Sequence, residues 1–391
     1  MMVLASIAAM LAVFGLCQTL AGYVLVRRFR KSPLGAAEIL PPVTVLKPLF
    51  GAEPLLEEAL ATLCCQEYGP YQIVFGVHDE GDPALAVVRR VQARFPASDI
   101  AVVVNPAQHG RNGKVSNLIN MMVEARHDVL VIADSDVHCA PDYLHRLVAA
   151  LQQGGTGLVT TLYAGLAASP GLAGALGATA ITHGFLPGAL MARALGRQDC
   201  LGATMALRRG TLQAIGGFQA VAEEIADDAV LGRRVRALGL AVGLADTVPV
   251  TTVPETWLTP LFAHERRWGR TILSLAPGQF ALSSVQYPLA WALLALGLSG
   301  GSEWAWAVLL AGWSLRALVG RAIDRSLGLA RSGLATPTPV WLLPLRDVMS
   351  VGVLLASYAS DEVRWRGELL TVPVVPPHMG AISTLPQGTK N

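Results

Sequence analysis

Charged residues are scarce in this chain. Lys, Arg, Asp and Glu together make up 15% of its 391 residues, where about 25% is ordinary for soluble domains. The formal net charge is only +2, and no basic patch interleaved with aromatic residues is present, which argues against a nucleic-acid partner. The five cysteines lack metal-binding spacing and form no even-numbered framework, so they fit a reducing compartment. Because 52% of the residues are hydrophobic, the shortage of charge indicates membrane segments.

The first uncharged run lies at the amino terminus. Residues 1–26 carry no charge and are long enough to span a bilayer. Four basic residues follow within 27–31, and such residues stay on the cytoplasmic side. A cleaved signal peptide, the alternative, would have its charges before the apolar run. We therefore expect an uncleaved transmembrane anchor over 1–31, followed by a cytosolic domain over 41–280.

Alternating strands and helices are predicted from residue 41 onward. Repeated β-α-β units imply an α/β fold of nucleotide-binding type, with a parallel sheet and right-handed crossovers. The predicted strands are 43–46, 71–77, 100–104, 129–133, 158–162 and 199–208. The predicted helices are 53–65, 83–95, 114–125 and 229–238.

Two aspartates follow the most apolar of these strands. The run Val129–Ala133 ends at Asp134 and Asp136, and a short continuous apolar run is typical of a strand buried on both faces. Ligands of open α/β sheets collect outside the carboxyl ends of the strands. Two carboxylates at this position can share Mg²⁺ or Mn²⁺, which prefer oxygen ligands. The alternative is that they cap the helix that opens at Pro141, and a short motif alone does not decide between the two.

Further polar candidates precede two of the helices. Asp82 lies just past the second strand, at the same edge of the sheet as Asp134, although Asp82 followed by proline is also a good helix cap. Lys114 and Asn117 open the third helix after the glycine-bearing turn 110–113. A helix amino terminus favours anions, and the alternative is an exposed loop.

Residues 163–192 contain no Asp, Glu, Lys or Arg. A second span here would place Asp228 and Asp134 on opposite sides of the membrane. We therefore predict an interfacial segment that dips into the headgroup region and approaches a lipid substrate. His183 is its one residue expected to titrate near neutral pH, and a purely structural histidine is the alternative.

Two charged clusters lie further along the chain. Four acids within 223–228 precede a helix, and they would suit the positive end of that helix. Alternatively, one of these acids acts as a general base that deprotonates a hydroxyl. The segment 264–270 contains His264, Arg267 and Trp268. It is typical of a juxtamembrane basic and aromatic belt, or of a guanidinium and an indole that hold a diphosphate.

The carboxyl third of the chain is predicted to form a membrane region over 284–360. Runs 287–298 and 304–318 predict a hairpin, and the arginines after it indicate the cytosolic side. The run 340–358 is interrupted by Arg346 and Asp347. An intramembrane ion pair is costly, so this piece is predicted to be re-entrant or functional. A flexible Pro/Gly-rich tail is expected over 371–391.

Six motifs occur in order along the chain: Val43-Thr-Val-Leu-Lys-Pro-Leu49, Asp79-x-x-Asp82-Pro83, Lys114-x-x-Asn117-Leu118, Asp134-Ser-Asp136, Asp227-Asp228 and Arg267-Trp268. Together they resemble the ceramide glucosyltransferases, a glycosyltransferase family 21 type. The resemblance covers roughly residues 43–270, and its motifs occur in the family's order. Two further segments, 200–205 and 264–268, look most like the bacterial hopanoid-biosynthesis glycosyltransferases.

The resemblance implies a GT-A fold, a UDP-sugar donor, a divalent cation (Mg²⁺ or Mn²⁺) and inversion at the anomeric carbon. The expected roles, by matching position, are donor binding for Lys47, Asp82 (uridine), Lys114, Asn117, Asp134, Arg267 and Trp268; metal binding for Asp134 and Asp136; and general base for Asp228. The closing motif of the family normally begins with Gln or Arg, and this chain has His264. This departure leaves the role of His264 open, and we place both His264 and His183 on the acceptor side. It also weighs against a processive polymer synthase, in which Gln is expected at this position.

The resemblance also implies a function. We expect a multi-pass enzyme of the bacterial inner membrane that transfers N-acetylglucosamine from UDP-N-acetylglucosamine to a lipid hydroxyl, as on the hopanoid polyol bacteriohopanetetrol. One alternative is a UDP-glucose-dependent ceramide or other lipid glucosyltransferase. Another is an inactive membrane scaffold with a GT-A fold, against which the retained aspartates and the Arg-Trp pair argue. The residues themselves do not distinguish the sugars, the acceptors or the metal ions.

Overall fold

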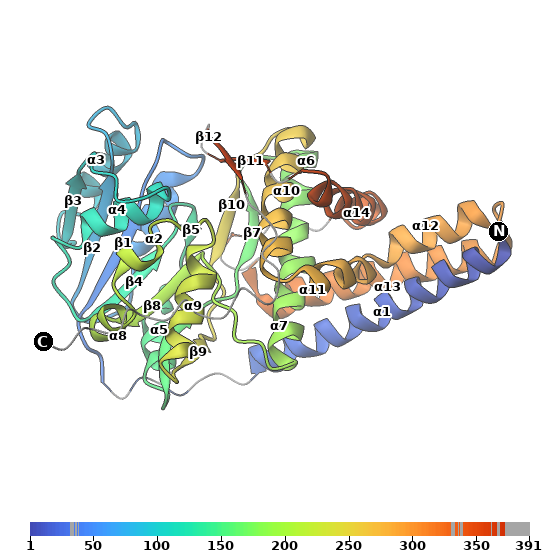
Figure 1. Ribbon diagram of the computed structural model, residues 1–391, viewed down its shortest axis with the longest axis horizontal. Coiled ribbons are helices and arrows are strands. Elements are labelled where there is room, and N and C mark those ends of the chain that lie inside the picture. Colours follow the sequence, from blue (N-terminus) through green and yellow to red (C-terminus); the bar gives the residue numbers. More distant parts are fainter. Residues whose placement is uncertain are drawn as a thin grey trace, which may run out of the picture.

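The computed structural model describes residues 1–31, 35, 37, 39–329, 333, 334, 336, 339–360, 362–365 and 368–371. A β-sheet flanked by helices forms one part of the molecule, and long apolar helices extend from it to form the other (Figure 1). The tail expected at 371–391 falls outside the described residues apart from Thr371.

The central sheet has seven strands, and its apolar side chains alternate between two helical layers. Val129 and Val131 belong to the core on one face, and Leu130 and Ile132 to the core on the other. This period of two is what a strand buried on both faces requires. The strand order is β3 (Ile100–Val104), β2 (Tyr71–Val77), β1 (Val43–Pro48), β4 (Val129–Ala133), β8 (Thr204–Arg208), β6 (Thr156–Thr160) and β9 (Ala241–Leu244).

Helices cover both faces of this sheet. On the face of Val129 lie α2 (Leu56–Cys64), α3 (Ala84–Arg94) and α5 (Tyr143–Leu151). On the face of Leu130 lie α4 (Gly113–Met121), α8 (Arg209–Ala214), the short η2 (Phe218–Val221) and α9 (Asp227–Ala237). The predicted α/β fold class is therefore confirmed.

The expectation of a wholly parallel sheet is wrong at one strand. β8 runs antiparallel to both of its neighbours, β4 and β6. The chain reaches β8 after a long excursion through residues 137–194 rather than through a single crossover helix. Apolar periodicity reports which faces of a strand are buried and carries no information about its direction.

A second, three-stranded sheet borders the carboxyl end of β4. In it β10 (Val250–Val253) pairs antiparallel with β5 (Val137–His138) and parallel with β7 (Ala164–Ala167). The backbone N–H of Thr252 donates to the carbonyl of Asp136 at 3.2 Å. This small sheet therefore fixes the far end of the loop that carries Asp134 and Asp136. A further hairpin consists of β11 (Glu362–Trp365) and β12 (Glu368–Thr371).

Four helical runs among the described residues are long and apolar enough to cross a membrane, and a pair bent by 68° would add a fifth. The four are Met2–Lys31, Leu172–Ala194, Glu303–Leu327 and Val340–Ala359, and the bent pair is Pro277–Gln286 with Pro288–Leu298. These helices make the chain a membrane-associated protein. The number of crossings, the cytosolic side and the boundaries 1–31, 41–280 and 284–360 stay predictions.

The uncharged segment 163–192 is mostly helical. It contains β7 and then α6 (Leu172–Thr179), the π-helical turn η1 (Ala180–Phe185) and α7 (Leu186–Ala194). In this run of helices 56% of the most apolar stretch is buried inside the protein, so more than half of this stretch packs against other elements. Its interfacial position stays a prediction.

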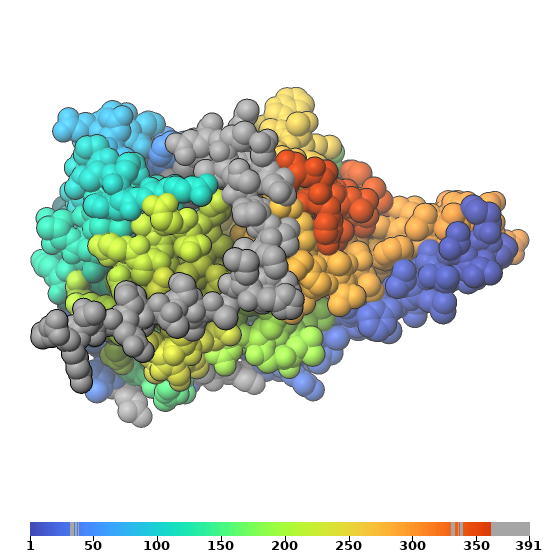
Figure 2. Space-filling view, in the orientation of Figure 1, coloured from blue at the N-terminus to red at the C-terminus, as the bar shows by residue number. Residues whose placement is uncertain are grey.

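The helices α1 (Met2–Lys31), α12 (Pro288–Leu298) and α13 (Glu303–Leu327) form an arm that tapers away from the sheet (Figures 1 and 2). Small residues on α1 are buried in this arm, among them Ala5, Ala8 and Ala12. A Cβ atom at Gly15 would lie 2.2 Å from the carbonyl oxygen of Val285. Close backbone approach at small residues is the usual way in which membrane helices associate.

Arg346 and Asp347 bind to neighbouring helices rather than to each other. Both lie on α14 (Leu343–Ala359), which follows the short η5 (Val340–Leu342). Arg346 makes two bonds of 2.7 Å to the carboxylate of Glu265 on α10 (Leu258–Leu275). Asp347 accepts a bond of 2.7 Å from Arg316 on α13 and one of 3.0 Å from the N–H of Leu289. The predicted intramembrane pair is thus two ion pairs that tie α14 to α10 and α13.

Candidate active site

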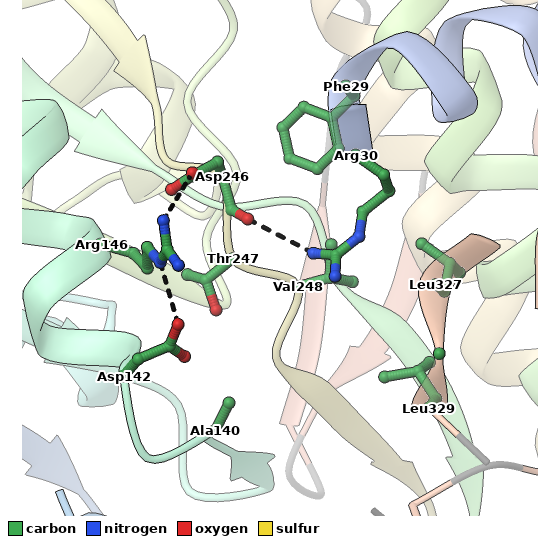
Figure 3. A pocket seen from close by; sticks show the side chains of 11 residues that line it. Phe29, Arg30, Ala140, Asp142, Arg146, Asp246, Thr247, Val248, Leu327 and Leu329 are labelled. Atoms are coloured by element: carbon green, nitrogen blue, oxygen red, sulfur yellow. Dashed lines mark hydrogen bonds and ion pairs between the residues drawn. The ribbon is translucent and has the colours of Figure 1, made fainter. Parts of the chain in front are cut away.

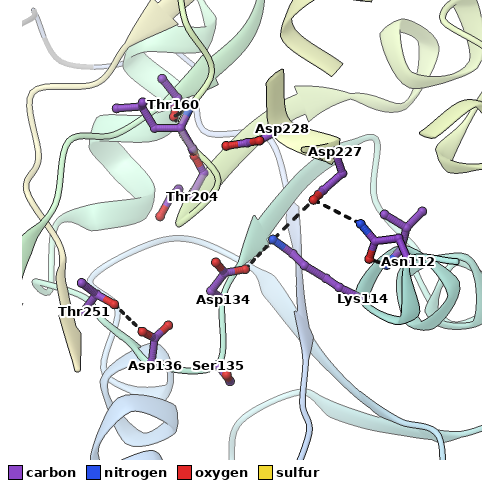
Figure 4. Close-up of polar contacts among 12 residues, drawn as sticks. Asn112, Lys114, Asp134, Ser135, Asp136, Thr160, Thr204, Asp227, Asp228 and Thr251 are labelled. Atoms are coloured by element: carbon purple, nitrogen blue, oxygen red, sulfur yellow. Dashed lines mark hydrogen bonds and ion pairs between the residues drawn. The ribbon is translucent and has the colours of Figure 1, made fainter. Parts of the chain in front are cut away.

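Charged side chains from three elements meet at the carboxyl edge of the central sheet (Figure 4). Nζ of Lys114, on the first turn of α4, lies 2.6 Å from Oδ1 of Asp134 at the end of β4. The same Nζ lies 3.9 Å from Oδ2 of Asp227 at the start of α9, next to Asp228. The structure thus brings together Lys114, Asp134 and Asp228, which the sequence proposed separately.

Asn112 ties two of these elements together, and sequence reasoning missed it. Its Oδ1 accepts a bond of 3.1 Å from the N–H of Val115 and so caps α4. Its Nδ2 donates to the carbonyl of Glu224 at 2.8 Å and to Oδ1 of Asp227 at 3.4 Å. An asparagine directly before a helix is a recognisable cap signal, but its long-range partners leave no trace in the local sequence.

Lys114 remains a cation over the physiological pH range. Burial alone would lower the pKa of its ammonium group, but the charges of Asp134 and Asp227 outweigh burial and raise the pKa above its ordinary value. A fixed positive charge beside Asp134 suits the developing negative charge of a phosphate leaving group.

Asp228 is an acid that titrates near neutral pH. Burial and the neighbouring charge of Asp227 raise its pKa from 3.8 to about 7, against the opposing effect of Lys114. A Cβ atom at position 202 would lie 3.0 Å from Oδ2 of Asp228, so Gly202 leaves room for the carboxylate. A carboxylate with such a pKa has the properties of a general base at neutral pH.

The capping alternative does not describe these acids. The N-cap residue of α9 is Ala226, which has no side chain that could form a capping hydrogen bond. Oδ1 of Asp228 accepts a hydrogen bond of 2.7 Å from the N–H of Ala229, the next residue. The carboxylate of Asp227 is directed toward Asn112 and Lys114 instead. The two acids still lie in the first turn of a helix, where its positive end favours them.

The negative charge of Asp136 is not fully balanced by a neighbouring positive charge. Burial and the repulsion of Asp134 raise its pKa from 3.8 to about 6, while a bond from the hydroxyl of Thr251 opposes this. The side chain of Asp134 is 35% exposed, so its carboxylate is accessible from the site. Two adjacent carboxylates that repel each other fit a hard divalent cation.

The donor set restricts which cation fits. Among the described residues, no group of three or more His, Cys, Asp and Glu side chains is arranged to hold a metal ion. Asp134 and Asp136 therefore stay the predicted metal ligands, and water and substrate oxygens would fill the remaining positions. Mg²⁺ and Mn²⁺ accept such a mixed oxygen shell, commonly with phosphates.

Two of the predicted donor-side residues are buried and bond to the backbone. Nζ of Lys47 is buried and donates to the carbonyl of Val137 at 3.0 Å. Nδ2 of Asn117 donates to the carbonyl of Gly76 at 2.8 Å and is buried too. Both side chains therefore hold the strand ends and loops in place. Their contact with a donor stays a prediction.

Asp82 acts as a cap in the structure. Its Oδ1 accepts a bond of 2.8 Å from the N–H of Ala84, at the start of α3, and both of its oxygens accept from the N–H of Gly51 at 3.0 and 3.1 Å. The carboxylate thereby joins the loops that follow β1 and β2. Its predicted contact with uridine is not tested by these bonds.

A second polar cluster lies on α10. Nδ1 of His264 is 2.6 Å from Oε1 of Glu255, and its ring lies edge-on to Trp268 with 4.4 Å between centroids. Burial would raise the pKa of Glu255, but His264 and its hydrogen bond lower it below the usual value. His264 thus positions Trp268, which is 37% exposed, while Arg267 next to it is half-buried.

His183 is directed into the membrane helices. Its Nε2 lies 2.6 Å from Oδ1 of Asp324 on α13. The pair connects the π-helical turn η1 to the long arm. His183 therefore bridges η1 and α13. Its role on the acceptor side stays a prediction.

A cavity of about 330 Å³ lies where α1, α5 and the end of α13 meet (Figure 3). Arg146 in its wall binds Asp142 at 2.9 Å and Asp246 at 3.1 Å, and Arg30 donates to the carbonyl of Asp246 at 3.5 Å. These contacts join the amino-terminal helix to the sheet domain. None of the cluster of Lys114, Asp134 and Asp228 lines this cavity.

The chain combines an α/β sheet domain that has an acidic, lysine-bearing edge with helices long and apolar enough to cross a membrane. Residues 7–374 match the family described as Glycosyl transferase family 21. The chain therefore belongs to glycosyl transferase family 21.

Curated relatives match a smaller part. A ceramide glucosyltransferase of Candida albicans is 30% identical over 126 residues, 29% of this chain and 23% of the relative. Ceramide glucosyltransferase 1 of Caenorhabditis elegans is 30% identical over 103 residues, 26% of this chain and 22% of the relative. The matches thus span less than a quarter of the length of these relatives.

Solved structures resemble the chain more distantly. A mannosyltransferase of Pyrobaculum calidifontis, solved with GDP-Man and Mn²⁺, has a TM-score of 0.49 and 21% identity, covering 91% of this chain and 98% of that one. Glucosyl-3-phosphoglycerate synthase of Mycobacterium tuberculosis, solved with Mn²⁺ and UDP, has a TM-score of 0.36 and 19% identity, covering 60% of this chain and 79% of that one. These TM-scores and identities compare the folds of the proteins and carry no information about their substrates.

Proposed function

We propose that this chain is an inverting, metal-dependent glycosyltransferase that moves N-acetylglucosamine from UDP-N-acetylglucosamine to a hydroxyl of a membrane lipid, a hopanoid polyol such as bacteriohopanetetrol. The observation that carries the proposal is the half-buried acid Asp228, whose pKa is raised to about 7, near the pair of Lys114 and Asp134. Family membership supports glycosyl transfer. The choice of sugar and acceptor rests on the resemblance of 200–205 and 264–268 to hopanoid enzymes.

The charges at the site suggest how the chain performs the transfer. Asp228 accepts the proton of the acceptor hydroxyl, whose oxygen then attacks the anomeric carbon from the face opposite UDP. UDP departs with its bonding electron pair, and the ammonium of Lys114 faces the negative charge that develops. Asp134 and Asp136 would hold the divalent cation, which supplies Lewis-acid stabilisation of the diphosphate when bound.

The remaining predicted residues have supporting places. Asp82 orders the loops after β1 and β2, where the uridine would lie. Trp268, braced by His264, and Arg267 form a surface on α10 that closes over the donor diphosphate. A planar guanidinium suits this task because it binds phosphate oxygens in pairs. The lipid acceptor reaches Asp228 from the bilayer, past the uncharged segment 163–192.

A second candidate is a UDP-glucose-dependent ceramide glucosyltransferase. The observation that favours it is the 30% identity to ceramide glucosyltransferases over 126 residues. It requires the same base and the same cation, and differs in the sugar and the lipid.

A transfer assay on membranes that contain the full chain tests both candidates. UDP-N-acetylglucosamine and UDP-glucose, radiolabelled in the sugar, are each offered with bacteriohopanetetrol or with ceramide. Label transferred from UDP-N-acetylglucosamine to the hopanoid supports the first candidate. Glucose on ceramide supports the second. No labelled lipid from any pair, from a folded protein, would overturn both and favour an inactive scaffold in the bacterial inner membrane.

Removal of the divalent cation is expected to stop transfer. Asp134 and Asp136 cannot by themselves neutralise a diphosphate, because both are anions. A chelator should therefore reduce labelled lipid to background, and added Mg²⁺ or Mn²⁺ should restore it. The double variant Asp134→Asn/Asp136→Asn should stay inactive at any metal concentration. Full activity of the wild-type chain in excess chelator would contradict the metal site.

The rate of transfer is expected to rise with pH through a midpoint near 7. Asp228 must be deprotonated to accept a proton, and its raised pKa places that change at about 7. The charged and titratable groups around it are Asp227, Lys114, Asp134, Cys200 and Tyr163. Asp227→Asn removes a neighbouring negative charge, so the midpoint should move to lower pH. A midpoint that stays in place would remove Asp228 from this role.

A further inference from the structure

Tyr163 lies between the acid cluster and the membrane-associated segment. It follows β6 and directly precedes β7, so the backbone holds it at the junction of the two sheets. Its ring packs against the core of the central sheet and also against the cluster formed by α6, α10 and β10. The side chain is half-buried, and one part of it therefore remains accessible.

The ring of Tyr163 is held by an aromatic stack. It lies on Phe185 with 4.5 Å between ring centroids and an interplanar angle of 30°. Phe185 ends the π-helical turn η1 of the uncharged segment. His183, from the same turn, points to Asp324 instead. The aromatic pair is thus one contact between this turn and the edge of the sheet domain, and the N–H of Gly165, which donates to the hydroxyl of Thr182 at 3.0 Å, is another.

The hydroxyl of Tyr163 lies in the field of the site carboxylates. Burial and the charges of Asp228, Asp134 and Asp136 raise the pKa of the phenol, so it keeps its proton. None of the hydrogen bonds within the described ranges involves this hydroxyl, whereas Tyr68 and Tyr71 each donate to a backbone carbonyl. A protonated phenol that bonds no other group within the described residues can bond a substrate hydroxyl.

We infer that Tyr163 binds the lipid acceptor: its ring and Phe185 contact the apolar part next to the polar head, and its hydroxyl bonds a hydroxyl adjacent to the one that Asp228 deprotonates. This inference rests on the proposed function and adds to it a residue that fixes which acceptor oxygen faces the base. An amphipathic side chain suits this boundary, because one end of tyrosine is apolar and the other forms hydrogen bonds.

Tyr163→Phe keeps the stack on Phe185 and removes the hydroxyl. With bacteriohopanetetrol in membranes as the probe, or ceramide if that is the lipid that accepts sugar, the KM for the lipid should rise about three- to tenfold, the range of one neutral hydrogen bond. The KM for the UDP-sugar should not change, because Tyr163 is placed on the acceptor side. Phe185→Leu keeps the hydroxyl but loosens its support, and should also raise the lipid KM.

Tyr68→Phe is the matched control. It removes a tyrosine hydroxyl that donates to the carbonyl of Pro41 at 2.8 Å, remote from the acids, and should leave both KM values unchanged. An unchanged lipid KM in Tyr163→Phe, or an equal rise in both KM values, would overturn the inference while the proposed function stands. Absence of transfer by the wild-type chain would overturn the proposed function, and the inference with it.

Discussion

Asp228→Asn is expected to lower the turnover number by about 10²- to 10⁴-fold, the usual contribution of a general base. Asparagine has the size of aspartate but cannot accept the proton of the acceptor hydroxyl. The measurement is initial-rate transfer of labelled sugar at saturating donor and lipid. The KM for the UDP-sugar should change little, because Lys114 and Asp134 remain in place. Transfer at the wild-type rate would show that another group removes the proton.

The same substitution is expected to stabilise the folded protein above neutral pH. Asp228 has a pKa of about 7 in the folded chain against an ordinary 3.8. A raised carboxyl pKa means that the folded state binds its proton more tightly, so stability falls as pH rises from about 4 to about 7. Asparagine carries no proton to lose. The midpoint of thermal unfolding at pH 8 should therefore be higher in Asp228→Asn than in the wild type.

A surface aspartate provides the control for both measurements. Asp99 is exposed and pairs with Arg126 far from the acid cluster. Asp99→Asn should change neither the transfer rate nor the pH dependence of unfolding by an appreciable amount, since surface substitutions usually stay within about 0.5 kcal/mol. An equal effect of Asp99→Asn and Asp228→Asn would mean that the loss of one negative charge, rather than of a base, is being measured.

Arg346→Met is expected to destabilise the protein by about 3–5 kcal/mol, the range for breaking a buried ion pair. The guanidinium binds both oxygens of Glu265 at 2.7 Å, and both residues are buried. Its removal leaves a carboxylate without its partner in an apolar surrounding. Because Glu265 lies between His264 and Arg267 on α10, the loss should also lower transfer activity. Thermal unfolding in detergent and the transfer assay measure the two effects.

The double variant Glu265→Gln/Arg346→Met separates the pair from the packing of its side chains. With the charge of Glu265 removed as well, most of the lost stability should return, because replacing both members of a buried pair is often nearly neutral. Arg321→Met, at an exposed position of α13, is the control and should stay close to wild type. A single variant Arg346→Met as stable as the wild type would show that Glu265 finds another partner.

Parts of the fold that depend on local pattern could be predicted from the sequence. The run Val129–Ala133 gives a strand because five successive apolar residues need burial on both faces. Asp134 and Asp136 at its end follow from strand geometry alone. The direction of β8 could not be predicted, because the alternation of apolar residues is the same in parallel and antiparallel strands.

Contacts between distant residues account for most of what the sequence did not reveal. Arg346 next to Asp347 looked like a local ion pair, yet their partners, Glu265 and Arg316, lie on other helices. Tyr163 was one aromatic residue in an uncharged segment, and nothing nearby in the sequence marks its stack on Phe185. Such pairings arise from the packing of helices and loops, which residue spacing does not encode.

The anomeric configuration of the glycolipid product is the most direct test of the central claim, that Asp228 serves as the base in a single displacement. The sugar is α-linked to UDP, so attack from the opposite face predicts a β-linked product. The measurement is the coupling constant of the anomeric proton in the purified lipid product. A β-linkage formed by the wild type and absent from Asp228→Asn is the expected result. An α-linkage would contradict the mechanism.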